Sequence, residues 1–492
     1  MTNRNIAVIG FEYGITVPAF SQVLQRLAEE GEQLSPVIWS ARDGVKQDVL
    51  NYFPKCEFLD HADGWHGSCP NLPISEVEEM PPISELEIKH FSYTHSRLTF
   101  FRDPVKWTGK DVFFYQHIFN VCCTLLKKYK ISLIFFVKMP HSLLDLGLYF
   151  AAKRLGVKFL YTDGPFFGDY VFPNIDKTAN FGIGGFPLSD DAKAKLQLAL
   201  RKRNLSYNLE PPAYTIKKAL GYLPKIPEPT HVFFGKKISR QIFEKTGSIF
   251  AMRVLDRLLS LNIRIISACY KKLVQLIYVK NNLDVSKKKY ILVLLQYHPE
   301  QTTSASAKDT PFEDERVELI AKQFPDTSII VREHPSNIKS DNFIQYRSFR
   351  ALYRMIKNKN VQYIFPGERL EYRDILQNAL CAVATSGTVA FESIQLGVPC
   401  IHFCDSFAHG FPGVLCAENI NELSIDRISE MRNELSNLSN EELVLKCSEA
   451  FTIRPMRKGF LTGYHEDKYS QKQFIENATE IIYTALSYKL NT

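Results

Sequence analysis

The sequence ATSGTVAFESIQLGVPCIHF, from Ala384 to Phe403, decides the fold. The apolar run Cys381–Ala384 before it predicts a buried strand, and Thr385–Thr388 predicts a hydroxyl-rich turn that contains one glycine. The next residues place apolar side chains on one side of a helix. Gly397 ends that helix, and the chain turns into a second strand at Cys400–Phe403. The stretch therefore predicts a β-α-β unit of a parallel sheet.

The turn of this unit is a candidate phosphate-binding element. A turn between a strand and a helix presents backbone N–H groups and hydroxyls, which attract phosphate, and its glycine lets a ligand approach the backbone. The alternative is an ordinary β-α-β unit whose helix is capped by a Ser or Thr side chain. The candidate residues are Thr385, Ser386, Gly387, Thr388 and Glu392.

Length and composition set the class of protein. The 492 residues are too many for one ordinary core and suit two or three domains, and 45% hydrophobic with 23% charged residues is a globular composition. We expect no secretory leader, since the first residues lead directly into a strand, and no run approaches the roughly 20 apolar residues of a membrane span. Ten cysteines without a CxxC pair predict reduced core thiols in a cytoplasmic protein.

The first half of the chain alternates strands and helices. We predict strands at Ile6–Gly10, Val37–Trp39, Leu133–Val137 and Gly156–Tyr161, with helices between them. Residues 52–110 are rich in proline and are expected to be rich in loops. This alternation is typical of a parallel sheet in an α/β domain.

The second half repeats this pattern. Strands are predicted at Tyr290–Leu295, Ser328–Val331 and Val361–Phe365, with a helix at Phe312–Phe324. Together with the first half they predict an α/β protein of the GT-B type, in which two Rossmann-like doubly wound domains face across a cleft. The expected parts are an N-terminal Rossmann-like domain with loop-rich insertions (1–235), a basic helical linker (236–289), a C-terminal Rossmann-like domain (290–470) and a closing helix (471–492).

Polar residues at predicted strand ends are the candidates for chemistry, because ligands of parallel sheets bind beyond the carboxyl ends of the strands. Asp163 ends one strand and can act as a base or a nucleophile, or can be a turn aspartate bonded to its own backbone. His334 ends another, and Pro335 keeps it out of helical geometry. Its imidazole can bind phosphate or hold a backbone carbonyl. Further residues expected in the cleft are Gln296, His298, Glu300, Arg332, Gly10 and Tyr13.

Three short motifs occur in a fixed order: Thr162-Asp163-Gly164, Glu333-His334-Pro335 and Thr385-Ser386-Gly387-Thr388. This order resembles that of bacterial glycosyltransferases that use CMP-activated 2-keto acid sugars, namely the bacterial sialyltransferases and the capsule Kdo transferases. Thr162 stands where the sialyltransferase motif prefers an acid. Residues 290–335 look most similar to the capsule polysaccharide synthesis family.

The resemblance implies a metal-independent glycosyltransferase without a cofactor. Its donor would be CMP-Kdo, or next CMP-sialic acid, and its acceptor a saccharide or a lipid-linked molecule. It implies that Asp163 is the catalytic carboxylate, in an inverting or a retaining reaction, and that His334, Ser386 and Thr388 bind the leaving phosphate.

Three other functions stay open on the same residues. One is a CDP-alditol phosphotransferase of wall-polymer synthesis, which would use a histidine base and not Asp163. Another is a non-catalytic GT-B-shaped partner in a capsule assembly complex. The third is a hydrolysing sugar-nucleotide epimerase, whose glycine-rich turn is similar to Ser386-Gly387-Thr388.

The positive charge is concentrated in one segment. Residues 236–289 hold thirteen Lys or Arg against three Asp or Glu, a net charge of +10. Since the whole chain has a net charge of +7, the remaining residues together carry −3. Basic residues such as Arg253 and Lys272 interleave there with apolar ones. This pattern predicts either an interdomain helix with a solvated basic face or a peripheral contact with the inner face of a bacterial membrane. No motif of the usual nucleic-acid-binding modules is present.

Overall fold

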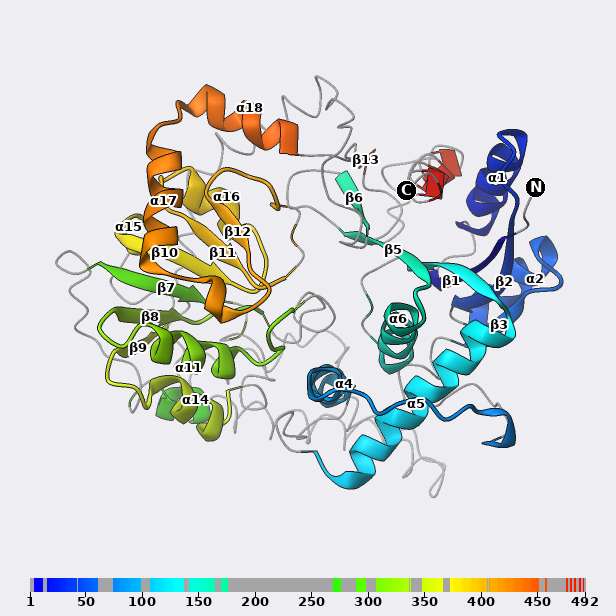
Figure 1. Ribbon diagram of the computed structural model, residues 1–492, viewed down its shortest axis with the longest axis horizontal. Helices are drawn as coiled ribbons and strands as arrows, with labels where there is room; N and C mark the ends of the chain where they lie inside the picture. Colours follow the sequence, from blue (N-terminus) through cyan, green and yellow to red (C-terminus); the bar gives the residue numbers. More distant parts are fainter. Residues whose placement is uncertain are drawn as a thin grey trace, which may run out of the picture.

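The computed structural model describes two α/β units joined in one chain (Figure 1). The described residues are 4–11, 16–41, 43–60, 74–98, 107–136, 140, 142–163, 170–175, 269–274, 276, 289–297, 307–335, 337, 347–365, 372–404, 406, 408–450, 456–457, 475–476, 478–479, 482–483, 486–487 and 490.

The N-terminal sheet has seven strands in the order β13-β6-β5-β4-β1-β2-β3. Its strands are β1 (Arg4–Phe11), β2 (Leu34–Ala41), β3 (Glu57–Asp60), β4 (Ile131–Phe136), β5 (Lys158–Asp163), β6 (Tyr170–Ile175) and β13 (Met456–Arg457). Strands β1 to β5 pair in parallel, whereas β6 is antiparallel to β5, and β13 to β6. The parallel part has the Rossmann order 3-2-1-4-5.

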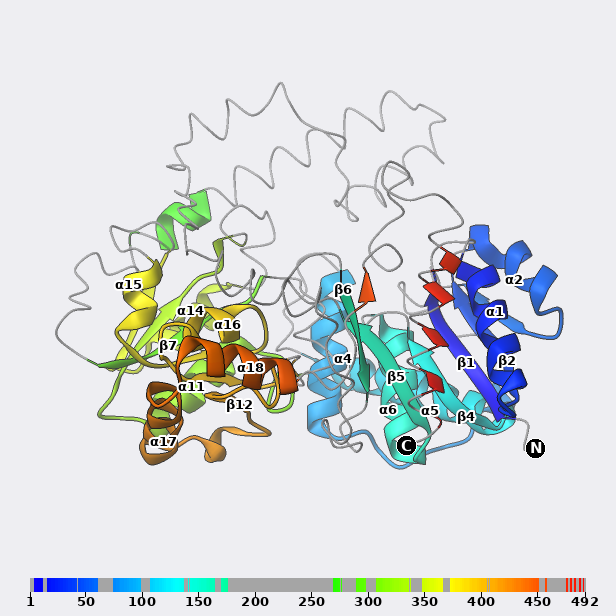
Figure 2. The same ribbon diagram turned by 90° about the horizontal axis from the view of Figure 1, so that it is seen from above.

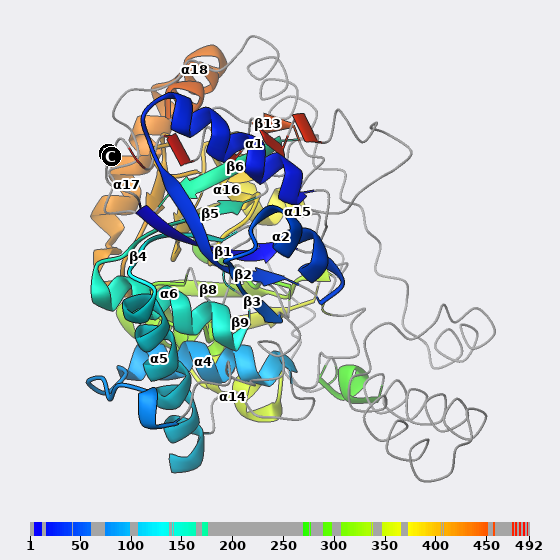
Figure 3. The same ribbon diagram turned by 90° about the vertical axis from the view of Figure 1, so that its right-hand side faces the viewer.

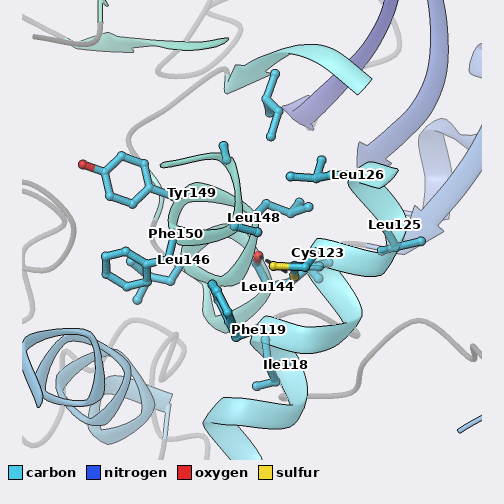
Figure 4. Packing of buried hydrophobic residues seen from close by; sticks show 14 of the residues in the cluster. Ile118, Phe119, Cys123, Leu125, Leu126, Leu144, Leu146, Leu148, Tyr149 and Phe150 are labelled. Atoms are coloured by element: carbon cyan, nitrogen blue, oxygen red, sulfur yellow. Dashed lines mark hydrogen bonds between the residues drawn. The ribbon is translucent and has the colours of Figure 1, made fainter. Parts of the chain in front are cut away.

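Helices cover both faces of this sheet. They are α1 (Thr16–Glu29), α2 (Lys46–Tyr52), α4 (Glu85–Leu98), α5 (Gly109–Lys128) and α6 (Leu143–Leu155). Capping boxes start α5 at Thr108 and α6 at Ser142. Helices α5 and α6 pack closely because Gly147 has no side chain: a Cβ there would lie 2.7 Å from Cys122 Sγ. The leucines and aromatic residues of both helices fill the core around this contact (Figure 4).

The C-terminal sheet has six parallel strands in the order β12-β11-β10-β7-β8-β9. They are β7 (Tyr290–Leu294), β8 (Ser328–Arg332), β9 (Val361–Ile364), β10 (Ala379–Ala384), β11 (Cys400–His402) and β12 (Val414–Cys416). This is the Rossmann order 3-2-1-4-5-6.

Successive side chains of each strand enter different cores. In β8, Ile329 and Val331 pack into one apolar cluster and Ile330 into the other, as the two-residue period of a strand requires. The helices of this unit are α11 (Glu313–Gln323), α14 (Phe349–Ile356), α15 (Tyr372–Gln377), α16 (Val389–Ile394), α17 (Ile425–Ser436) and α18 (Asn440–Ala450). Helices α11 and α14 lie on the face of Val331, and α15 and α16 on the face of Ile330.

The C-terminal end of the chain returns to the N-terminal unit. Ala478, Ile482 and Leu486 are fully buried in the same cluster as apolar residues of α1, and the guanidinium of Arg26 lies 3.6 Å from the ring centre of Tyr483. Figures 1 and 3 show the red pieces of this C-terminal segment near α1. The spacing of four between the buried residues matches one face of a helix.

The observed elements confirm the predicted α/β class and the GT-B type, since one chain holds two Rossmann-like sheets. The predicted strands and helices of both units are present, with ends shifted by a few residues. The domain limits and the cleft between the units stay predictions. Of the basic segment, residues 269–274 and 276 are described and are helical, and the rest lies outside the described residues. Among the described helices, none is long and apolar enough to cross a membrane.

One helix was not predicted. The loop-rich stretch 52–110 contains strand β3 and the 14-residue helix α4. A signal for α4 exists in the sequence: Ser84 and Glu87 form reciprocal hydrogen bonds between side chain and backbone, the Ser-x-x-Glu capping box.

Candidate functional site

The candidate site lies at the switch point of the C-terminal sheet. In the order β9-β8-β7-β10-β11-β12, the connections reverse direction between β7 and β10, and ligands of open α/β sheets bind beyond the carboxyl ends of the strands at such a point. The loop after β7 contains Gln296, and the turn after β10 is Thr385–Thr388. His334 follows β8, the strand next to β7.

Gln296 connects these three loops by hydrogen bonds. Its backbone N–H donates to Oε1 of Glu313 in α11 at 2.6 Å, and its Nε2 donates to the carbonyl of Ser386 at 2.5 Å. Nδ2 of Asn337, just beyond His334, donates to the Gln296 carbonyl at 2.7 Å. The loops after β7, β8 and β10 therefore form one hydrogen-bonded unit. The sequence predicts Gln296 only as a residue of the cleft, whereas in the structure it joins these loops.

The turn after β10 is buried at its start and more open at its end. Thr385 and Ser386 are buried, whereas Gly387 and Thr388 are half-buried. Gly387 has φ of 115°, a backbone conformation that favours glycine. Thr388 makes no capping hydrogen bond to α16, which is only six residues long. The side chain of Thr388 therefore does not cap α16.

Glu392 holds the end of this turn. It accepts from the Thr388 hydroxyl at 2.8 Å and from the Tyr372 hydroxyl at 2.7 Å, so both its carboxylate oxygens are engaged within the protein. Burial and the neighbouring Glu392 raise the pKa of Tyr372 well above its ordinary value. The guanidinium of Arg332 stacks on the Tyr372 ring, 4.6 Å from its centre. Burial lowers the pKa of Arg332, and Tyr372 and Glu392 partly offset this.

His334 is half-buried, and its ring centre lies 5.9 Å from that of Tyr297. Its backbone N–H donates to Oε1 of Glu333 at 2.7 Å. The fully buried Glu333 also accepts from Arg347 Nε at 2.5 Å, from the Tyr363 hydroxyl at 2.6 Å and from Asn337 Nδ2 at 2.8 Å. The backbone of His334 is therefore bound to a carboxylate that Arg347, Tyr363 and Asn337 hold in place.

The charge of this buried network is unequal. Arg347 forms ion pairs with both Glu333 and Glu313, at 2.5 and 2.9 Å. Burial disfavours the charged form of Glu333, but Arg347 and the hydrogen bonds from Tyr363 and Asn337 more than offset this and lower its pKa. One arginine thus faces two carboxylates behind His334.

Most of this network was not predicted from the sequence, namely Glu313, Asn337, Arg347 and Tyr363. A partial signal exists, because Glu333 follows a strand at a position two residues after the buried Val331. A carboxylate at such a position requires partners.

The remaining predicted residues fall in two groups. Strand β5 ends at Asp163 beside β4 and β6, and Gly10 near the end of β1 has φ of 91°. The side chain of Asp163 lies outside the described residues, and so do Tyr13, His298 and Glu300. The structure brings Gln296, His334, Pro335, Thr385, Ser386, Gly387 and Thr388 together around the switch point, with Arg332 and Glu392 on the α15/α16 side of it. No cluster of three or more potential metal ligands occurs among the described residues.

No protein-family model and no curated protein matches the chain. Among solved structures it is similar to UDP-GlcNAc 2-epimerase from Neisseria meningitidis bound to UDP-GlcNAc (12% identity, 99% of this chain and 100% of that one, TM-score 0.21). It is also similar to Thermosulfurimonas dismutans KpsC, a beta Kdo 2,7 transferase (13% identity, 81% of this chain and 97% of that one, TM-score 0.28). A third similar structure is a glycosyltransferase from Rickettsia africae (10% identity, 99% of this chain and 97% of that one, TM-score 0.22). Because these identities and TM-scores are low, function is argued from the residues of this chain.

Proposed function

We propose that the chain is a glycosyltransferase that moves a 2-keto acid sugar from a CMP-sugar to a saccharide or lipid-linked acceptor in capsule or surface polysaccharide synthesis. Kdo is the favoured sugar and sialic acid the second. The observation that supports this proposal is the hydrogen-bonded unit at the switch point, in which Gln296 joins the loop of His334 to the turn of Ser386. This is where an open α/β sheet binds the phosphate end of a nucleotide.

The proposed chemistry is stabilisation of a leaving phosphate. When the glycosyl–phosphate bond breaks, negative charge develops on CMP, and preorganised donors stabilise it most. His334 is half-buried. The turn after β10, joined to the His334 loop through Gln296, adds the Ser386 hydroxyl and backbone N–H groups as donors. Glu333 and Glu392 act indirectly, since their oxygens hold the His334 loop and the Thr388 hydroxyl.

The acceptor side of the proposal depends on Asp163. It ends β5, which lies beside β4, and β4 and β1 flank the switch point of the N-terminal sheet. In an inverting reaction its carboxylate would deprotonate the acceptor hydroxyl, and in a retaining reaction it would attack the anomeric carbon.

The donor is tested by thermal unfolding with CMP, CDP, UDP and GDP, followed by assays of CMP-Kdo, CMP-sialic acid, a CDP-alditol and UDP-GlcNAc. We expect CMP to stabilise the protein, by about 2.7 kcal/mol at one hundred times its Kd, and CMP to be released from a CMP-sugar. Turnover of the CDP-alditol or of UDP-GlcNAc would contradict the proposal in favour of a phosphotransferase or an epimerase. Absence of any nucleotide binding would indicate the non-catalytic partner.

The roles of His334 and Asp163 are tested by substitution. We expect His334→Ala to lower turnover about 10²-fold, since it removes a phosphate donor. The control is His117→Ala in α5 of the other unit, which should keep full turnover.

Asp163→Asn should abolish transfer and keep CMP binding. Full transfer by Asp163→Asn would remove this residue from the mechanism.

A further inference from the structure

Helix α4 of the N-terminal unit contacts the C-terminal unit at residues 307–315. Nζ of Lys89 lies 2.7 Å from Oε1 of Glu315, and the rings of Tyr93 and Phe312 are 6.1 Å apart between their centres. The buried His90 is hydrogen-bonded to the backbone of Ala307. Figures 1 and 2 show α4 on the side of its unit that faces the other one. Residues 307–315 are thus held from the N-terminal unit by three side chains of one helix.

The same segment is bonded to Arg316, the next residue along α11. The Arg316 guanidinium donates to both oxygens of Asp309, at 2.9 and 2.7 Å, and to the carbonyl of Thr310 at 2.6 Å. Its remaining Nη1 donates to the hydroxyl of Thr385. One side chain therefore joins the segment that α4 contacts to the first residue of the turn after β10.

This joint is buried and charged. The side chains of Arg316 and Asp309 are 3% and 5% exposed, and Thr385 is 1% exposed. Burial works against the charge of Arg316, but Asp309 more than offsets it, and the pKa of Arg316 is raised. The two-residue period of β10 explains the contact: Val383 packs on the α11 face and Ala384 on the other, so Thr385 points to α11.

We propose that Arg316 is a positioning residue, which fixes the turn 385–388 through Thr385 and makes its order depend on the contact of α4 with residues 307–315. A buried hydrogen bond to a charged donor is stronger than a neutral one, so its loss frees the turn. The consequence for the donor rests on the proposed function: nucleotide affinity is higher when α4 is docked. The positioning of the turn 385–388 by Arg316 is a property of the unliganded protein and does not rest on the proposed donor.

Amide hydrogen exchange of the unliganded protein, measured on peptides covering 383–389, tests the proposal. We expect Thr385→Val, which keeps the shape and loses the hydroxyl, to raise exchange there about 10-fold. Thr385→Ser, which restores the acceptor, should exchange like the unmodified protein. Equal exchange in Thr385→Val and the unmodified protein, or equally raised exchange in both variants, would overturn the role of Arg316.

The dependence on α4 is tested with two substitutions in this helix. Tyr93→Leu weakens the contact with Phe312 and should raise exchange at 383–389. Phe91→Leu is the matched control, because Phe91 faces the N-terminal core, stacked on Tyr115, and should leave 383–389 unchanged. If Tyr93→Leu alters only peptides of α4 and residues 307–315, the coupling is refuted.

Nucleotide titration then separates this inference from the proposed function. With CMP, Thr385→Val and Tyr93→Leu should both raise Kd about 10-fold. With a saturating CMP-sugar, Tyr93→Leu should leave kcat near that of the unmodified protein. If exchange changes as expected but no variant binds CMP, the positioning role stands and the proposed donor is wrong. If CMP binds and exchange at 383–389 is unaffected, the donor stands and the positioning role is wrong.

Discussion

His402 in β11 is a buried residue whose polar atoms are unsatisfied. It is 0% exposed, and neither ring nitrogen has a hydrogen-bond partner among the described residues. Burial lowers its pKa to about 4 from an ordinary 6.5. A neutral imidazole buried without hydrogen-bond partners loses its hydration, and no protein hydrogen bond offsets the free-energy cost. The residue therefore opposes folding within its own strand.

We predict that His402→Leu raises the free energy of unfolding by about 1–2 kcal/mol at pH 8, because an apolar side chain of similar volume needs no partner. Above pH 6.5 the imidazole is neutral in both states. Between pH 6.5 and about 4, His402 binds a proton in the unfolded chain but stays neutral in the folded protein, which destabilises the unmodified protein. The stability gained by His402→Leu therefore increases as pH falls from 6.5 to 4.

Urea unfolding at pH 8 and pH 5 measures this difference. The half-buried His117, replaced by leucine, is the control and should change neither value appreciably. Destabilisation by His402→Leu at both pH values would show that the imidazole has a stabilising role.

At the scale of the element, the end of β8 separates two tasks by its alternation. Arg332 and Glu333 leave the sheet on opposite faces, Arg332 toward Tyr372 of α15 and Glu333 toward Glu313 of α11 and its partner Arg347. His334 follows immediately and takes its backbone position from Glu333. The strand end is therefore rigid where the histidine begins.

We predict that Glu333→Gln lowers the free energy of unfolding by about 3–5 kcal/mol at pH 7, since it leaves part of the charge of Arg347 uncompensated in the interior. The pKa of Glu333 is lowered from 4.5, so its contribution is complete above pH 4.5 and is lost as pH falls further. As pH falls below 4.5, the free energy of unfolding should therefore decrease less in the variant than in the unmodified protein.

The exposed pair of Glu430 and Arg427 supplies the control: Glu430→Gln should cost less than about 1 kcal/mol. A change of this small size in Glu333→Gln would contradict a structural role of the network.

At the scale of the whole molecule, charge and exposed apolar surface occur together. The basic segment 236–289 carries +10. Its described residues, 269–274 and 276, contact α14 through the rings of Tyr270 and Phe349, which are 4.9 Å apart between centres. Leu276 and Tyr353 of these two elements are 72% and 63% exposed. Lys271, by contrast, is buried and does not belong to the basic surface expected from the sequence.

We predict that the protein sediments with anionic vesicles at low salt and is released as salt increases, since each basic residue near such a surface contributes about 1 kcal/mol and screening acts within roughly 10 Å at 0.1 M salt. Replacing Arg253, Arg257 and Arg264 by glutamine should abolish sedimentation and keep transfer to a short acceptor in solution. Replacing Lys127, Lys128 and Lys130 removes the same charge elsewhere and should not. Protein that stays in the supernatant at low salt would identify the segment as an interdomain element.

The sequence by itself determined the alternation of strands and helices in both units. Apolar runs such as Tyr290–Leu294 and Ala379–Ala384 are buried on both faces of a parallel sheet, so burial can be read directly from composition. The same pattern located His334 and Thr385–Thr388 at strand ends, because a strand ends where its apolar run ends. Local signals were enough for these features.

Only the tertiary structure decided what holds the candidate site. Arg347 reaches Glu333 across 14 positions, Tyr363 across 30, and Arg316 reaches Thr385 across 69. These pairs meet because β7 lies between β8 and β10 and because α11 and α14 cover one face of the sheet. No local pattern encodes such partners, since a buried carboxylate requires a cation but its sequence neighbours do not reveal which one the strand order will bring.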